Sequence, residues 1–177
     1  MRTVIVFLRG INVGGHKKIK MADLRDMLTS LGFETVQTYI QSGNVVLQTS
    51  EANPETIIEN GILDTFGWEV PVFVKTPLEI EAVLAQCPFS EEKKEKSYFS
   101  LLHAVPTSEN IELASQISYP NEEFHITDQC IYFYCATGFG KAKLSNNWFE
   151  KKLGVSATAR NYRTLTKMLE LARALST

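Results

Sequence analysis

Glycine, asparagine and basic side chains are concentrated in residues 8–18, whose sequence LRGINVGGHKK follows a short apolar run. Glycine tolerates positive φ, so a glycine-rich turn can direct successive backbone N–H groups toward one spot, and such a concavity attracts anions. Neighbouring basic side chains would add positive charge. The segment therefore predicts an anion-binding turn. The residues expected to contribute are Arg9, Gly10, Asn12, Gly14, Gly15 and Lys17.

The spacing of these glycines differs from that of the familiar phosphate-binding motifs. A dinucleotide-binding turn requires GxGxxG at the start of a helix, and a P-loop requires GxxxxGK followed by Ser or Thr. Here Gly10 is followed by Gly14 and Gly15, and then by His16. The sequence consequently specifies no cofactor and no catalytic nucleophile. His16 could titrate near neutral pH, although a plain surface histidine is the simpler interpretation.

The elements that must position this turn follow from hydrophobic periodicity. A β-branched apolar run predicts a strand before the turn, and apolar residues at helical spacing predict a helix after it. The elements expected in the first half are strands at 3–8, 36–41, 44–48 and 70–74 and helices at 21–31 and 54–67. Ser42 and Gly43 are expected to form a tight turn between the second and third strands.

The second half repeats this order of elements. The sequence predicts strands at 98–105, 123–127, 130–136 and 157–159, and helices at 108–117, 144–153 and 162–175. The order β-α-β-β-α-β is that of the ferredoxin-like unit. The sequence thus predicts an α+β protein of two ferredoxin-like units in tandem, with a C-terminal helix appended. The units are expected at residues 1–76 and 97–177, joined by a connecting helix and a charged linker at 77–96.

This topology places a second set of polar residues beside the glycine-rich turn. In a ferredoxin-like sheet the first two strands run parallel, with the third strand between them. The turn after the first strand and the hairpin between the second and third strands then lie at one end of the sheet. We therefore expect Ser42, Gly43 and Asn44 to join the candidate site, with a purely structural turn as the alternative.

A basic cluster is expected in the second half as well. The segment 138–143, GFGKAK, precedes one predicted helix, and the segment 158–161, TARN, precedes the last. Helix N-termini attract anions through unpaired N–H groups and the helix dipole. Lys141, Lys143, Arg160 and Asn161 are therefore candidate binding residues. Arg160 and Asn161 could instead cap the last helix and pair with acidic side chains of the chain.

Composition and charge limit the class of protein. A content of 44% hydrophobic and 21% charged residues is typical of a globular chain. No run approaches the roughly 18 apolar residues of a membrane span, and the first residues do not resemble a secretory signal, so we expect a cytoplasmic protein that does not enter the membrane. Three cysteines without CxxC spacing and three scattered histidines predict neither a disulfide framework nor a metal site.

The charges are segregated along the chain. Residues 1–20 carry five basic and no acidic side chains, and residues 138–177 carry eight basic and two acidic ones. The middle of the chain carries five basic and eighteen acidic side chains. Such asymmetry favours an anionic partner, although the two ends could equally neutralise the acidic middle in the fold.

Four motifs together resemble a widespread bacterial family of proteins of unknown function. They are LRGINVGG at 8–15, Met21 with Leu24, YIQSGNV at 39–45, and TARNY at 158–162 with Thr164. The resemblance covers nearly the whole chain and implies a fold of two ferredoxin-like halves. Three positions depart from the family pattern: Lys141 stands where an arginine is frequent, Ala142 where a serine is frequent, and Tyr162 where a tryptophan is frequent. The resemblance implies no particular activity.

Two functions remain open at this point. In the first, the protein binds a phosphate-bearing or other anionic ligand, a nucleotide or a nucleic acid, through its basic glycine-rich turns. In the second, it is an enzyme acting on a small anionic substrate. Arg9 and Arg160 would then stabilise charge in the transition state, and His16 would carry a proton.

Overall fold

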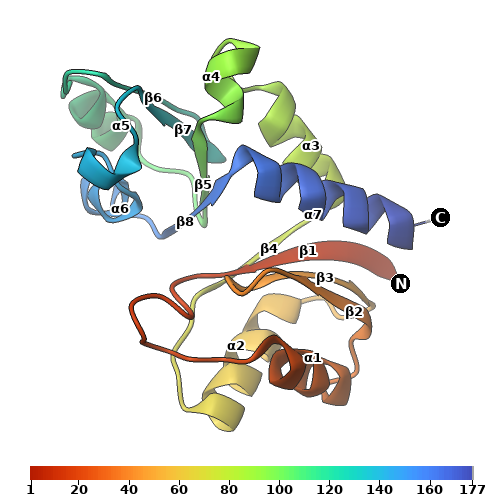
Figure 1. Ribbon diagram of the computed structural model, residues 1–177. Helices are drawn as coiled ribbons and strands as arrows, with labels where there is room; N and C mark the ends of the chain where they lie inside the picture. The colour runs from red at the N-terminus through yellow and green to blue at the C-terminus, as the bar shows by residue number, and fades with distance from the viewer. Residues whose placement is uncertain (177) are drawn as a thin grey trace. The chain divides into compact units, whose positions relative to one another are not determined.

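The computed structural model describes residues 1–176. The chain divides into two compact units (Figure 1). Unit 1 comprises Met1–Glu81 together with the segment from Thr166 onward, and unit 2 comprises Ala82–Leu165. The division falls inside helix α3 (Pro77–Ala85), and the last helix, α7 (Tyr162–Leu175), is shared between the units. The sequence had placed the end of the first unit at residue 76 and the whole last helix in the second unit.

Unit 1 contains a four-stranded antiparallel sheet and two helices that follow its first and third strands. The strands are β1 (Arg2–Leu8), β2 (Glu34–Tyr39), β3 (Asn44–Thr49) and β4 (Val72–Lys75), and the helices are α1 (Met21–Ser30) and α2 (Pro54–Phe66). The strand order is β2-β3-β1-β4, and β3 is antiparallel to both β1 and β2. Strands β1 and β2 are therefore parallel, as predicted. The turn after β1 and the β2–β3 hairpin consequently lie at the same end of the sheet.

The core of unit 1 lies between this sheet and its two helices. Because side chains alternate along a strand, Val4, Val6 and Leu8 of β1 share one face. They pack in one cluster with Leu24 of α1 and Ile62 of α2, and all five are buried. This packing fixes β1 up to its last residue, Leu8, after which the polar residues of the candidate site begin.

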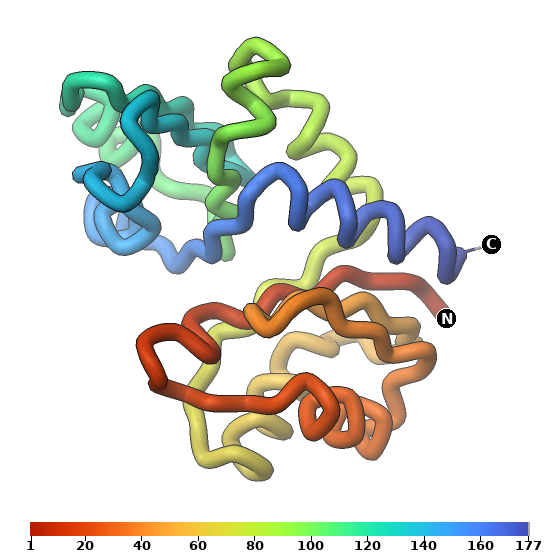
Figure 2. The backbone as a smooth tube through the Cα atoms, in the orientation of Figure 1, coloured from red at the N-terminus to blue at the C-terminus, as the bar shows by residue number. Residues whose placement is uncertain are grey.

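The opposite face of the same sheet is contacted by the last part of α7. Gln48 Nε2 donates to the carbonyl oxygen of Leu175 at 3.1 Å, and Ser176 Oγ donates to Thr3 Oγ1 at 3.1 Å. Thr3 and Gln48 are register partners in β1 and β3. Figure 2 shows this part of the chain running beside β1. Unit 1 is thus completed by residues from the far end of the sequence.

Unit 2 repeats the sheet topology of unit 1. Its strands are β5 (Tyr98–Leu102), β6 (Glu122–Ile126), β7 (Cys130–Cys135) and β8 (Ala157–Asn161), and its helices include α4 (Glu91–Glu95), α5 (Ser108–Ser115) and α6 (Asn146–Leu153). The strand order is β6-β7-β5-β8 with antiparallel neighbours. Ile131 of β7 packs in one buried cluster with Ala114 of α5 and Phe149 of α6. Both units therefore have the predicted ferredoxin-like order.

Three local expectations were wrong. Within the predicted connection at 77–96, the charged part expected to be a solvated linker contains α4, whose charges pair along the helix, with Lys96 Nζ 2.9 Å from Glu92 Oε1. The segment 138–143 does not lead directly into a helix, because a 3-10 turn, η1 (Phe139–Lys141), is followed by extended chain and α6 begins at Asn146. The last strand extends through residue 161. Within residues 1–176, no helix is both long enough and apolar enough to cross a bilayer.

Candidate functional site

The two adjacent glycines after β1 form the tip of a small hairpin. His16 N donates to the carbonyl oxygen of Val13 at 3.0 Å, and these two residues form an isolated antiparallel bridge. Gly14 and Gly15 have φ of 57° and 78°. Two consecutive positive φ values are the requirement of a type I′ turn, in which glycine is favoured. The two glycines therefore have a structural reason to be present, and the turn they form is exposed.

Asn12 ties this loop to the neighbouring hairpin. Its Nδ2 donates to the carbonyl oxygens of Ile19 at 2.9 Å and of Gln41 at 2.7 Å. Its Oδ1 accepts a hydrogen bond from Ile19 N at 2.8 Å. A primary amide has two hydrogens to donate, and both are used here. Asn12 therefore positions the loop, and its amide donates to the protein instead of to a ligand.

The hairpin residues lie beside the loop, as the topology predicts, but most are buried. Leu8 N donates to the carbonyl oxygen of Gly43 at 2.8 Å. A Cβ on Gly43 would lie 2.6 Å from Leu8 Cβ, and the residue has φ of 75°. Asn44 is fully buried, and its Nδ2 donates to Tyr39 O at 3.1 Å and to Ser42 Oγ at 2.8 Å. Gly43 and Asn44 thus build the loop contact, and only half-buried Ser42 has a surface.

Two of the basic side chains of the loop line one hollow in unit 1. Arg9 and Lys17 border a cavity of about 450 Å³. The remaining lining residues are Glu59, Asn60 and Leu63 of α2 and the segment 69–71 before β4. Arg9 N donates to the carbonyl oxygen of Pro71 at 3.0 Å, and Lys17 Nζ donates to the carbonyl oxygen of Glu69. These contacts hold both residues beside the segment that precedes β4.

Charges of both signs face this hollow. Glu59 and Glu69 line it together with Arg9 and Lys17. Glu59 Oε1 accepts a hydrogen bond from Val72 N at 3.1 Å, which fixes that carboxylate at the start of β4. Neither glutamate was predicted from the sequence. The signal was available in the topology: because β4 is antiparallel to β1, with Val72 opposite Leu8, the segment entering β4 must lie beside the turn that leaves β1.

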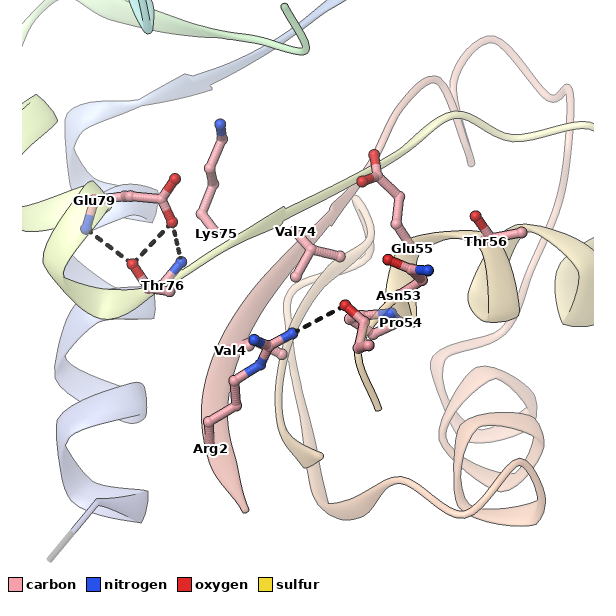
Figure 3. A pocket seen from close by; sticks show the side chains of 11 residues that line it. Arg2, Val4, Asn53, Pro54, Glu55, Thr56, Val74, Lys75, Thr76 and Glu79 are labelled. Atoms are coloured by element: carbon pink, nitrogen blue, oxygen red, sulfur yellow. Dashed lines mark hydrogen bonds between the residues drawn. The ribbon is translucent and has the colours of Figure 1, made fainter. Parts of the chain in front are cut away.

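A second hollow of about 290 Å³ lies near the start of β1 and was not predicted (Figure 3). Arg2 Nη2 donates to the carbonyl oxygen of Glu51 at 3.1 Å, and Lys75 also lines the hollow. Thr76 and Glu79 form a reciprocal cap, in which Glu79 Oε2 accepts from Thr76 N at 2.7 Å and Thr76 Oγ1 accepts from Glu79 N at 3.2 Å. These polar contacts join the start of β1 to the segment after β3 and cap the start of α3.

In unit 2, the backbone near Lys141 and Lys143 binds a carboxylate of the chain itself. Lys143 N and Leu144 N donate to Glu122 Oε1 and Oε2, both at 2.8 Å. The anion expected at this glycine-containing turn is therefore supplied by β6. The side chains of Lys141 and Lys143 remain exposed.

Arg160 and Asn161 also make contacts within the protein. Arg160 is 9% exposed, and its Nη1 donates to Thr158 Oγ1 at 2.8 Å and to Ala159 O at 2.9 Å. Burial lowers the pKa of this guanidinium to about 10. Asn161 Oδ1 accepts from Thr164 N at 2.8 Å, as expected of a residue that caps α7.

Histidine and cysteine add no reactive cluster. His16 is exposed at the base of the I′ turn and does not line the hollow. Burial raises the pKa of the Cys87 thiol, which disfavours the nucleophilic thiolate. In the part of the chain that the structure describes, no three His, Cys, Asp or Glu residues are grouped so that they could hold a metal ion.

A family model described as "Protein of unknown function (DUF1697)" matches residues 1–132. The chain belongs to the DUF1697 family. The solved structure of conserved bacterial protein SP0830 from Streptococcus pneumoniae is similar, with a TM-score of 0.72 and 21% sequence identity over 96% of this chain and 98% of that one. At this identity the likeness shows the fold alone. A search of curated proteins gave no match.

The family match divides the candidate residues into two groups. Arg9, Lys17 and the 42–44 hairpin lie inside the matched range, as do Glu59 and Glu69 of the hollow. The four candidates of the second basic cluster, at 141, 143, 160 and 161, lie beyond residue 132. The hollow of unit 1 is therefore built from residues that the DUF1697 match covers.

Proposed function

We propose that the protein binds a small phosphate-bearing ligand in the hollow of unit 1, through Arg9 and Lys17. The observation that carries the proposal is the convergence of these two basic side chains on one cavity of about 450 Å³. A volume of this size falls within the range of ordinary small-molecule sites.

The two cations suit complementary parts of a phosphate. Arginine presents a planar fork that matches two phosphate oxygens, and lysine supplies a compact charge that adapts to the remaining one. Both residues are half-buried, and attraction between charges is stronger in a partly enclosed site than in open water. The Arg9 backbone N–H donates to the Pro71 carbonyl and the Lys17 ammonium donates to the Glu69 carbonyl, so both residues are tied to the segment before β4 before a ligand arrives.

The two glutamates narrow the class of ligand. A bare polyanion would be repelled by Glu59 and Glu69, whereas hydroxyl or amino groups could donate hydrogen bonds to their carboxylates. A sugar phosphate or a nucleoside monophosphate carries both kinds of group. We therefore expect such a molecule to bind more tightly than sulfate or inorganic phosphate.

The alternative, an enzyme with Arg9 and Arg160 as charge clamps, gains no support from this geometry. The Arg160 guanidinium is buried and donates to Thr158 and Ala159. His16, the expected proton carrier, does not line the hollow.

Thermal unfolding tests the proposal with a panel of ribose 5-phosphate, adenosine monophosphate, inorganic phosphate and sulfate. A ligand present at about 100 times its Kd should stabilise the folded state by roughly 2.7 kcal/mol, which raises Tm by several degrees in a chain of this size. The shift should disappear in Arg9→Gln and in Lys17→Gln.

Lys18→Gln is the matched control, because Lys18 is the adjacent exposed lysine and does not line the hollow. Retention of the shift in this variant would separate the hollow from general surface charge. The proposal is wrong if no member of the panel shifts Tm, or if Lys18→Gln removes the shift as completely as Lys17→Gln.

A further inference from the structure

Unit 2 carries a surface on which aromatic rings and lysine side chains are interleaved. Its rings are half-buried, and its lysines come from the turn before α6 and from the end of that helix. We call this the aromatic–lysine surface. Its members are Tyr119, Phe124, Trp148, Lys141, Lys143, Lys151 and Lys152.

The rings are held rigidly by the core of unit 2. The Trp148 ring lies 6.2 Å from Tyr119 and 5.9 Å from Phe124, centroid to centroid, at interplanar angles of 74° and 64°. Trp148 also makes an edge contact with the buried Phe149 ring, with the centroids 5.0 Å apart. Edge-to-face contacts of this kind are favourable. The rings therefore lose little conformational entropy when a further ring stacks on them.

Two lysine ammonium groups lie over the rings of this surface. Lys143 Nζ is 5.4 Å from the centroid of Tyr119, and Lys152 Nζ is 5.8 Å from the centroid of Trp148. These distances are those of cation–π contacts. Positive charge and an aromatic face are thus offered at the same place.

Three acidic side chains near this surface in sequence have partners within unit 2: Glu123, adjacent to Phe124, pairs with Lys93, and Glu122 and Glu150 bind backbone N–H groups. Glu122 accepts from the N–H groups of Lys143 and Leu144, and Glu150 Oε1 accepts from Ala157 N at 2.8 Å. Within residues 1–176, none of the four lysines of the surface forms an ion pair. The positive charge of the surface is therefore available to an anionic partner.

We propose that the aromatic–lysine surface binds single-stranded nucleic acid. Unpaired bases would stack on Tyr119 and Trp148 in place of the Lys143 and Lys152 ammonium groups that lie over these rings, and the displaced lysines would contact the phosphates. Aromatic stacking beside basic side chains is how proteins bind single strands without reading their sequence. A duplex keeps its bases stacked on one another, so it offers the rings no free base. The surface differs from the sheet face that ferredoxin-like RNA-binding modules use, because Tyr132 on β7 is buried and donates to Val83 O at 2.8 Å. This inference does not depend on the hollow of unit 1.

Fluorescence anisotropy with labelled oligothymidylate and oligouridylate of about 12 nucleotides tests the proposal at low salt. Wild type should bind these probes more tightly than a duplex of equal length. The double variant Lys143→Gln/Lys152→Gln should weaken binding about tenfold, and the slope of log K against log salt should fall by about 1.4, or roughly 0.7 for each lost phosphate contact.

Lys93→Gln/Lys96→Gln is the control, since it removes the same charge from the same unit at two lysines that pair with Glu123 and Glu92. It should leave binding nearly unchanged. Equal weakening in both double variants would show general attraction to unit 2 and would overturn the proposal. Absence of binding up to about 100 µM protein at low salt would do the same.

Stacking has a separate readout, because the chain has two tryptophans, one in each unit. In a Trp68→Phe background, Trp148 becomes the only tryptophan and its fluorescence should be quenched when the probe binds. Binding without any change in Trp148 fluorescence would exclude the stacking arrangement. An acidic peptide that competes as well as the oligonucleotide would likewise count against a nucleic-acid surface.

Discussion

Gly43 is the residue on which the contact between the two loops of unit 1 depends most directly. Any Cβ at this position would meet Leu8 Cβ at 2.6 Å and Ile11 Cδ1 at 3.0 Å, both in buried side chains. Gly43→Ala should therefore destabilise the protein by about 3 kcal/mol, through strain at positive φ together with overpacking. Gly10→Ala is the matched control, because Gly10 has a similar φ of 73° but a Cβ there would have no neighbour within 4 Å, and about 1 kcal/mol is expected. Denaturant unfolding measures both, and equal losses would contradict the close contact.

The residues of the candidate site show which roles could be predicted from sequence composition and which could not. Arg9 and Lys17 were predicted as ligand-binding residues, and both line the hollow. Asn12, Gly43 and Asn44 were predicted on the same grounds. The side-chain amides of Asn12 and Asn44 instead make hydrogen bonds within the protein, and Gly43 is required because a Cβ would clash with Leu8. A ligand-binding turn and a purely structural turn both require positive φ and amide donors. Sequence composition cannot separate the two roles, whereas hydrogen-bond partners can.

Glu122 is the contact that joins β6 to the turn before α6. Its two carboxylate oxygens accept from consecutive N–H groups, those of Lys143 and Leu144. Glu122→Ala would leave both groups without this partner, so we expect a loss of about 2–3 kcal/mol, monitored by Trp148 fluorescence during denaturant unfolding. Glu123→Ala is the control, since its exposed pair with Lys93 should contribute about 1 kcal/mol or less. If Glu122→Ala lowers the free energy of unfolding no more than the control does, the carboxylate of Glu122 does not stabilise unit 2.

Elements with strong periodicity could be predicted from the sequence, whereas their ends and short neighbours could not. Residues 91–96 have the composition of a solvated linker, but their charges pair along the short helix α4. Strand β8 continues to residue 161 because Asn161 pairs with Tyr98 of β5, which lies far away in sequence. Pairing at this separation leaves no local signal. The order of elements was therefore more predictable than the structural setting of Arg160.

Unit 1 is discontinuous in sequence, and no local pattern could have predicted this. The apolar stripe of the last helix predicts a buried face, but it does not identify which unit that face completes. In the structure the segment from Thr166 onward belongs to unit 1, where Leu175 O accepts from Gln48 Nε2 and Arg173 Nη2 lies 2.5 Å from Glu81 Oε1. The first and last parts of the chain therefore depend on one another for stability.

Truncation after Leu165 tests this dependence, because it removes the buried side chains of Met168, Leu169 and Ala172 from unit 1. Loss of buried side chains of this size costs several kcal/mol. Trp68 reports on unit 1 and Trp148 on unit 2, so single-tryptophan variants follow each unit separately. We expect the truncation to lower the free energy of unfolding reported by Trp68 by several kcal/mol. The free energy of unfolding reported by Trp148 should fall by less. Arg173→Ala, which removes the exposed ion pair with Glu81, should change either free energy of unfolding by about 1 kcal/mol. If Trp148 responded more strongly than Trp68, the last segment would belong to unit 2, as the sequence alone had suggested.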